Sequence, residues 1–281
     1  MKEIIYSPKS IPNGIIPLIK SIIKDFYDGR HLGKQLFVRD LKAQYRQSFL
    51  GFFWAFAPTV VTALLWIFLN SSKVIQVDVK GMSYPIFTIV GTFIWQILTQ
   101  SLFNTMNCVS NGKSLLTKLN FPRESLLIHA IYTTLFNASI LFLVTVLISF
   151  ILGLQFSLGL LLFPFVMIDL MIVGMSLGLL FHSIFSMIAD FSKMITMALP
   201  FLMYVSAVIF PKPTKGNFAN IIFSINPFTH LVNFSREVFT GMPIDCTLAF
   251  VVVSAVSLIL LFVGLIMYKI TMPIIIERLG S

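Results

Sequence analysis

Long apolar stretches restrict the fold of this sequence more than any other feature. A helix needs about 20 apolar residues to cross a lipid bilayer, and six stretches reach or approach this length. The fifth contains Pro200, which predicts a kinked helix supported by its neighbours. The pattern therefore predicts an all-α membrane protein with six transmembrane helices, at about 50–70, 84–106, 125–153, 157–182, 193–211 and 247–268.

The composition leads to the same fold class. Of the 281 residues, 57% are hydrophobic and only 11% are charged, whereas soluble domains carry about 25% charged residues. A soluble protein of this length could not bury so much apolar surface. The formal net charge of +9 would suggest nucleic acid for a soluble protein. In a membrane protein, the distribution of the basic residues indicates instead which loops face the cytoplasm, and we expect no nucleic-acid partner.

The basic residues are divided unequally between the two sides of the predicted spans. Of the 20 Lys and Arg residues, 15 lie in the N-terminal region, the second-to-third loop, the fourth-to-fifth loop and the C-terminal tail. Loops rich in Lys and Arg stay in the cytoplasm, so both termini are predicted to be cytoplasmic. Residues 1–30 lack the apolar core of a signal peptide and are predicted to be a cytoplasmic extension.

Residues 31–49 predict an amphipathic helix that leads directly into the first span. An apolar stripe beside a basic face is typical of a helix in the inner headgroup layer, with membrane lipids as partners. A soluble helix that packs on a cytoplasmic element is the alternative. The two faces consist of Val38, Leu41, Tyr45 and Phe49 on one side and Arg39, Lys42 and Arg46 on the other.

The segment 212–246 predicts a re-entrant helical hairpin at the outer face. Its two apolar runs are too short to span a bilayer, and Asn226-Pro227 separates them. Such a hairpin is tolerated only where it is buried in protein or lines a cavity. We expect it to close the outer end, with its apolar side packed on the spans and Arg236 either held by polar partners or in water. The residues assigned to this outer gate are Asn226, Pro227, Phe228 and Arg236.

The stretch Gly112-Lys113-Ser114 is similar to the end of a phosphate-binding loop. The full motif needs a further glycine five residues before Gly112, but that position is Asn107. The motif should also follow a buried strand, whereas here a long apolar segment precedes it. The sequence therefore predicts that this chain is not an ATPase and binds no cofactor itself.

Two motifs resemble a known family. The stretches RDLKAQYRQSFLGFFWAFAPTV (39–60) and NPFTHLVNFSREVF (226–239), the basic loop with Phe-Pro-Arg (121–123) and the six-span layout are similar to the permease subunit of bacterial polysaccharide ABC exporters. These type-2 ABC transporters carry O-antigen, teichoic acid or capsule. The resemblance covers residues 31–281 as a single transmembrane domain.

The resemblance implies a multi-pass protein of the bacterial inner membrane that exports lipid-linked polysaccharide, with O-antigen the first expectation. Two copies of the chain would form the channel, and two copies of a separate ABC ATPase would hold ATP and Mg. The second-to-third loop would contain a cytoplasmic coupling helix that docks into the ATPase, although the tendency of basic loops to remain inside also explains its charges. The loop residues concerned are Lys113, Lys118, Phe121, Pro122 and Arg123.

Aromatic residues are candidates for the polysaccharide path. Aromatic faces contact sugar rings without fixed hydrogen bonds, so a polymer could slide along them. Each ring could instead face lipid or pack between helices. The candidates are Phe52, Phe53, Trp54, Trp66, Phe93, Trp95, Phe201 and Tyr204.

One acid, Asp169, lies well inside a predicted span. Acids in this position usually face the protein interior or water, so we expect Asp169 to pair with an interior polar group, for which His129 and His182 are candidates, or to be protonated. Two other functions compete with polymer export. The first is a type-2 ABC permease for a small molecule, drug or lipid. The second is a membrane glycosyl- or acyltransferase, which would need a carboxylate pair or metal-binding loop that no loop here offers.

Overall fold

The structure is a computed structural model that describes residues 15–46, 53–73, 79, 81–116, 121–185, 188–213, 217–245 and 247–280. Within these ranges the chain forms eleven helices and no strand, as the apolar pattern predicts. The helices are α1 (Ile15–Arg46), α2 (Phe53–Ser71), α3 (Tyr84–Met106), α4 (Cys108–Asn111), α5 (Lys113–Leu116), α6 (Glu124–Ile151), α7 (Leu158–Phe185), α8 (Ala189–Val205), α9 (Asn217–Ile225), α10 (Pro227–Thr240) and α11 (Thr247–Gly280).

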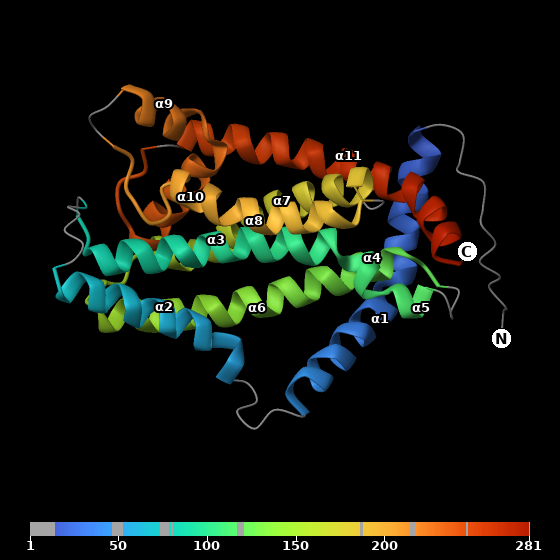
Figure 1. Ribbon diagram of the computed structural model, residues 1–281, viewed down its shortest axis with the longest axis horizontal. Coiled ribbons are helices and arrows are strands. Elements are labelled where there is room, and N and C mark those ends of the chain that lie inside the picture. The colour runs from blue at the N-terminus through green and yellow to red at the C-terminus, as the bar shows by residue number, and fades with distance from the viewer. Residues whose placement is uncertain are drawn as a thin grey trace.

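Four helices, α3, α6, α7 and α11, form the body of the molecule and run along its long axis (Figure 1). Each is long and apolar enough to cross a membrane. Helix α3 is the most buried and packs against α6 and α7, whereas α11 packs on α7 and leaves most of its surface exposed. Lipid can cover such an apolar surface, so its exposure needs no protein partner.

Two glycines bring the backbones of α3 and α7 close together. A Cβ atom at Gly174 would lie 2.5 Å from the carbonyl oxygen of Leu98, and one at Gly178 would lie 2.6 Å from that of Leu102. Ser101 also donates a hydrogen bond of 2.6 Å to the carbonyl of Met171. Small residues four apart allow this approach where the hydrophobic effect cannot drive helices together. The close approach of the α3 and α7 backbones therefore depends on glycine.

An aromatic cluster fills the centre of the bundle. Phe93 of α3, Phe163 of α7 and Phe239 of α10 are fully buried, with centroids 5.7 Å apart for Phe93–Phe163 and 5.1 Å for Phe163–Phe239. Phe142 stacks on Phe163 at 5.6 Å. Such pairs contribute about 0.5–1.5 kcal/mol each beyond the burial of their area. Phe93, a candidate for the polysaccharide path, therefore belongs to the core of a single chain.

The remaining two predicted spans correspond to α2 and α8. Helix α2 packs against α3 and α6. Helix α8 has 17 residues and ends at Val205, so the predicted span 193–211 begins later and ends later than the helix. One side of α8 packs on the core through Leu199, Leu202 and Met203. The count of six transmembrane helices stays a prediction, because α8 is shorter than a span requires.

Helix α1 differs from the helix predicted at 31–49. It begins at Ile15, so the expected boundary between an extension and the transmembrane domain falls inside one continuous helix. It crosses one end of the bundle steeply (Figure 1) and packs on the start of α6. Its buried residues recur at helical spacing but on a different face from the predicted stripe: Leu18, Ile22, Gly29, Gly33 and Leu36 are buried, whereas Val38 and Leu41 are only partly covered.

Candidate functional site

The loop between α3 and α6 lies at the end of the bundle that α1 crosses (Figure 1). Two single-turn helices, α4 and α5, occupy the place of the one coupling helix that was expected. They meet at Gly112, where a Cβ atom would lie 2.6 Å from a methyl group of Leu126. Glycine therefore lets the loop turn closely over α6, while Lys113 remains exposed at the turn. Lys118 lies outside the described residues.

The end of this loop is held by hydrogen bonds to the backbone. The hydroxyl of Ser125 donates to the carbonyl of Pro122 at 2.6 Å, and the hydroxyl of Tyr268, from α11, donates to the carbonyl of Arg123 at 3.1 Å. Phe121, Pro122 and Arg123 are all partly buried. Two of the five residues that the resemblance assigned to ATPase coupling, Pro122 and Arg123, are thus positioned by the start of α6 and by α11.

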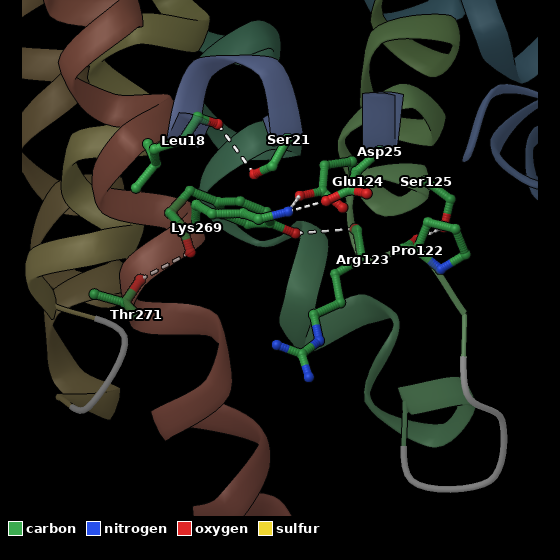
Figure 2. A network of polar contacts seen from close by, with 10 residues as sticks. Leu18, Ser21, Asp25, Pro122, Arg123, Glu124, Ser125, Lys269 and Thr271 are labelled. Carbon is green, nitrogen blue, oxygen red and sulfur yellow. Dashed lines mark hydrogen bonds and ion pairs between the residues drawn. The ribbon is translucent and has the colours of Figure 1, made fainter. Parts of the chain in front are cut away.

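An ion cluster lies directly behind the loop. Lys269 of α11 reaches toward Asp25 of α1 and Glu124 of α6 (Figure 2). The distance from Lys269 Nζ to Glu124 Oε1 is 2.8 Å. Glu124 also lies in the first turn of α6, where the helix dipole favours a negative charge. In the sequence analysis, Lys269 was only one of the basic residues used to predict the orientation in the membrane. Its ion pairs could not be predicted, because they join residues that lie far apart in the chain.

A hollow of about 330 Å³ lies between α1 and the loop. Leu32, Gln35, Leu36 and Arg39 line it from α1, and Leu115 and Phe121 line it from the loop. Arg39 also pairs with Asp40 of its own helix at 2.6 Å. Of the residues assigned to the predicted interfacial face, Lys42 is exposed, whereas the side chains of Tyr45 and Arg46 lie outside the described part of the chain.

At the opposite end, Asn226 joins α9 and α10 to the end of α8. Its side-chain oxygen accepts a hydrogen bond from the backbone N–H of Phe228 at 3.0 Å and so caps α10. Its amide nitrogen donates to the carbonyl of Val205 at 3.1 Å and to the hydroxyl of Ser206 at 2.9 Å. Asn226 has an extended backbone, as expected before Pro227.

Arg236 makes a second connection between α10 and the residues that follow α8. Its Nη2 donates to the carbonyls of Ala207 at 2.8 Å and Val208 at 3.1 Å, and its Nη1 donates to Asn233 Oδ1 at 3.1 Å. The guanidinium also lies 3.6 Å from the ring centre of Phe87. Burial lowers the pKa of Arg236, and the negative charge of the neighbouring Glu237 opposes this shift. Polar partners therefore hold Arg236, and it does not lie in water.

The two halves of the predicted hairpin differ in how they pack. In α10, Leu231 is fully buried, Phe228 contacts Trp95 with centroids 5.8 Å apart, and Phe234 stacks on Phe250 at 3.8 Å. In α9, Ile221 is 53% exposed and Ile222 is 37% exposed. The expectation that both halves pack their apolar sides on the spans was therefore right for α10 and wrong for α9.

The aromatic candidates for the path occupy different environments. Besides Phe93, Trp95 is buried in the core and Trp66 packs edge-on against Tyr84 at 6.0 Å. Phe201 and Tyr204 are exposed on α8, at 74% and 50%. Phe52 and the side chains of Phe53 and Trp54 lie outside the described residues. In the single chain, only α8 thus presents described path candidates on an open surface.

Asp169 pairs with an interior polar group, as expected, but its partner is neither of the two candidate histidines. Asp169 accepts a hydrogen bond of 2.8 Å from the hydroxyl of Ser254, which joins α7 to α11. His129 instead lies 3.2 Å from Asp40 of α1, and His182 hydrogen-bonds the carbonyl of Met106 at 2.9 Å. Each histidine is taken up by a contact between other helices, so Asp169 has a structural partner and no described histidine beside it.

Comparison with known proteins reveals a family and several relatives. The family described as ABC-2 type transporter matches residues 32–240. The O-antigen export system permease protein RfbA of Myxococcus xanthus is 24% identical over 247 residues, which cover 86% of this chain and 92% of that protein. RfbA of Klebsiella pneumoniae is 21% identical, and the match covers 72% of this chain and 77% of that protein. The polysialic acid transport protein KpsM of Escherichia coli is 22% identical, and the match covers 83% of this chain and 91% of that protein. Because the family match spans most of the 281 residues and four helices are suited to crossing a membrane, this chain is a multi-pass membrane protein of the ABC-2 type transporter family.

Proposed function

We propose that this chain is the channel-forming subunit of an exporter that moves lipid-linked polysaccharide across the bacterial inner membrane, with O-antigen as its cargo. One observation carries the proposal: relatives that match most of this chain and most of their own length are named for O-antigen export or polysialic acid transport. The family match, at residues 32–240, includes the loop, the α9–α10 segment and the helices between them.

The energy for transport comes from a separate ABC ATPase that binds ATP and Mg, with two copies of it below two copies of this chain. Support comes from the loop between α3 and α6, which exposes Lys113 and lines the hollow beside α1 with Leu115 and Phe121. Short helices rigidly attached to two spans can pass the motion of a partner to the membrane. This chain itself hydrolyses no ATP.

The end carrying α1 and the loop faces the cytoplasm, and both chain termini lie on that side. Basic residues of α1, the loop and the end of α11 gather at this end of the bundle, and the rule that Lys and Arg remain inside then sets the orientation. They include Lys20, Lys24, Lys34, Lys42, Lys113, Arg123 and Lys269. The α9–α10 segment lies at the other end of the bundle (Figure 1) and so belongs outside.

The polysaccharide path runs along the open side of α8, facing a second copy of this chain. That side combines Phe201 and Tyr204 with exposed polar residues, among them Lys193 and Thr196. Charged and polar side chains are costly against lipid but suit a water-filled passage. At the outer end, Asn226 and Arg236 tie α10 to the residues after α8, so α10 closes the passage by holding the end of α8 in place.

Reconstitution tests this function. The chain is purified with its partner ABC ATPase and placed in vesicles that contain fluorescent lipid-linked O-antigen. We expect ATP-dependent movement of the polymer across the membrane and no ATP hydrolysis by the chain alone. Transport of a short lipid or small hydrophobic molecule in place of the polymer would contradict polysaccharide export and identify a permease of another kind.

A further inference from the structure

The three charged groups behind the loop come from three separate parts of the chain. Lys269 lies on α11, Asp25 on α1 and Glu124 on α6, and Lys269 contacts both carboxylates (Figure 2). The neighbouring residue Tyr268 donates to the carbonyl of Arg123, the last residue before α6. One turn of α11 therefore holds α1, the start of α6 and the end of the loop.

The burial of this cluster separates it from an ordinary surface ion pair. The side chains of Lys269 and Glu124 are 22% and 5% exposed, whereas those of the pair Lys193–Asp190 are 74% and 79% exposed. Exposed pairs contribute little because water screens them. The removal of one partner from a buried pair leaves a charge without compensation. Without Lys269, Asp25 and Glu124 would face each other with no cation between them.

Close packing makes α1 and the start of α6 one unit. A Cβ atom at Gly29 would lie 3.1 Å from the backbone nitrogen of Ser125, and one at Gly33 would lie 2.8 Å from the carbonyl oxygen of that same residue. Phe37 of α1 stacks on Tyr132 with centroids 5.8 Å apart. Lys269 therefore connects α11 to an already rigid pair of helices, and the connection lies beside the loop.

We propose that Lys269 is a positioning residue for energy coupling. By holding Asp25 and Glu124, it joins α1, the loop and α11 into one body, so that a push on the loop moves membrane helices and does not merely bend the loop. The inference rests on the proposed function, in which an ATPase supplies that push. Lys269 itself contacts neither nucleotide nor cargo.

The first test uses the purified chain alone and measures hydrogen–deuterium exchange in peptides from the first half of α1. In Lys269→Met and Asp25→Asn we expect exchange to rise at least about tenfold, which corresponds to a loss of about 1.4 kcal/mol in the free energy of local opening. Lys193→Met, which removes a cation from an exposed pair, and Asp28→Asn, on the exposed side of α1, should match the wild type. Unchanged exchange in both Lys269→Met and Asp25→Asn would overturn the proposal.

The second test measures polymer moved per ATP hydrolysed in the reconstituted complex. Lys269→Met should lower this ratio at least about tenfold, while ATP hydrolysis stays within about threefold of wild type. The reason is that the ATPase still moves the loop, but this motion is no longer transmitted to the membrane helices. Lys269→Arg keeps a cation in place and should restore the ratio. If Lys269→Met does not fold, Asp25→Asn replaces it, because it leaves the Lys269–Glu124 pair intact.

The outcomes separate the two claims. A wild-type complex that moves no polymer contradicts the proposed function. A wild-type complex that moves polymer, with an unchanged ratio in Lys269→Met or Asp25→Asn, contradicts the positioning role alone. A fall in the ratio that Lys269→Arg does not reverse also contradicts it, because a cation at this position would then not be sufficient.

Discussion

Replacement of Arg236 by Met tests the connection between α10 and the end of α8. Met removes the charge and the donors and leaves the carbonyls of Ala207 and Val208 without those partners. Each buried carbonyl left unsatisfied costs about 1–3 kcal/mol, and the lost contact with Phe87 adds about 1 kcal/mol. We therefore expect a loss of about 3–7 kcal/mol of stability at this end of the molecule.

The assay is thermal unfolding of the detergent-purified chain, followed by ion leak in vesicles that contain the resting complex. At about 2–4 °C per kcal/mol, the midpoint should fall by at least about 6 °C, and leak without ATP should rise because the end of α8 is no longer held. Arg236→Lys keeps the charge but not the forked geometry, so an intermediate fall is expected.

The matched control is Lys212→Met, which removes a basic residue that is exposed near the same end of the molecule. It should behave as the wild type in both assays. An unfolding midpoint of Arg236→Met within about 2 °C of wild type, together with unchanged leak, would show that the two hydrogen bonds to Ala207 and Val208 do not hold the end of α8. That result would refute the reasoning for the outer gate.

Three further predictions follow from the geometry of the bundle. Gly174→Leu should abolish a monodisperse peak in size-exclusion chromatography, since even a Cβ atom there would lie 2.5 Å from a backbone oxygen of α3; a normal peak would show that the two helices can move apart. Arg123→Glu should weaken co-purification with the ATPase without loss of membrane insertion, and unchanged binding would remove the loop from the docking surface. In intact cells that carry Cys246→Ser to remove the native outer thiol, a membrane-impermeant thiol reagent should label Lys212→Cys but not Asn111→Cys, and the reverse pattern would invert the orientation. Native Cys108 cannot report on this, because its side chain is buried and would not react on either side.

The sequence by itself determined the properties that depend on local apolar content and on charge. Long apolar runs must form helices in lipid, because every backbone polar group there needs a partner within the segment. This requirement explains why α3, α6, α7 and α11 lie close to the predicted spans. The break at Asn226-Pro227 was equally predictable, since proline restricts the residue before it to an extended backbone.

Only the tertiary structure decided which side chains meet. The apolar pattern cannot separate a lipid-facing side from a protein-facing side, because both are apolar, so Phe93 in the core and Phe201 on the open side of α8 have the same signature in the sequence. The buried face of α1 depends on the close approach of Gly29 and Gly33 to α6. The contacts of Lys269 with Asp25 and Glu124, and of Arg236 with the carbonyls after α8, join distant segments. Such pairings follow from the packing of whole helices, and residue type and spacing along the chain do not encode them.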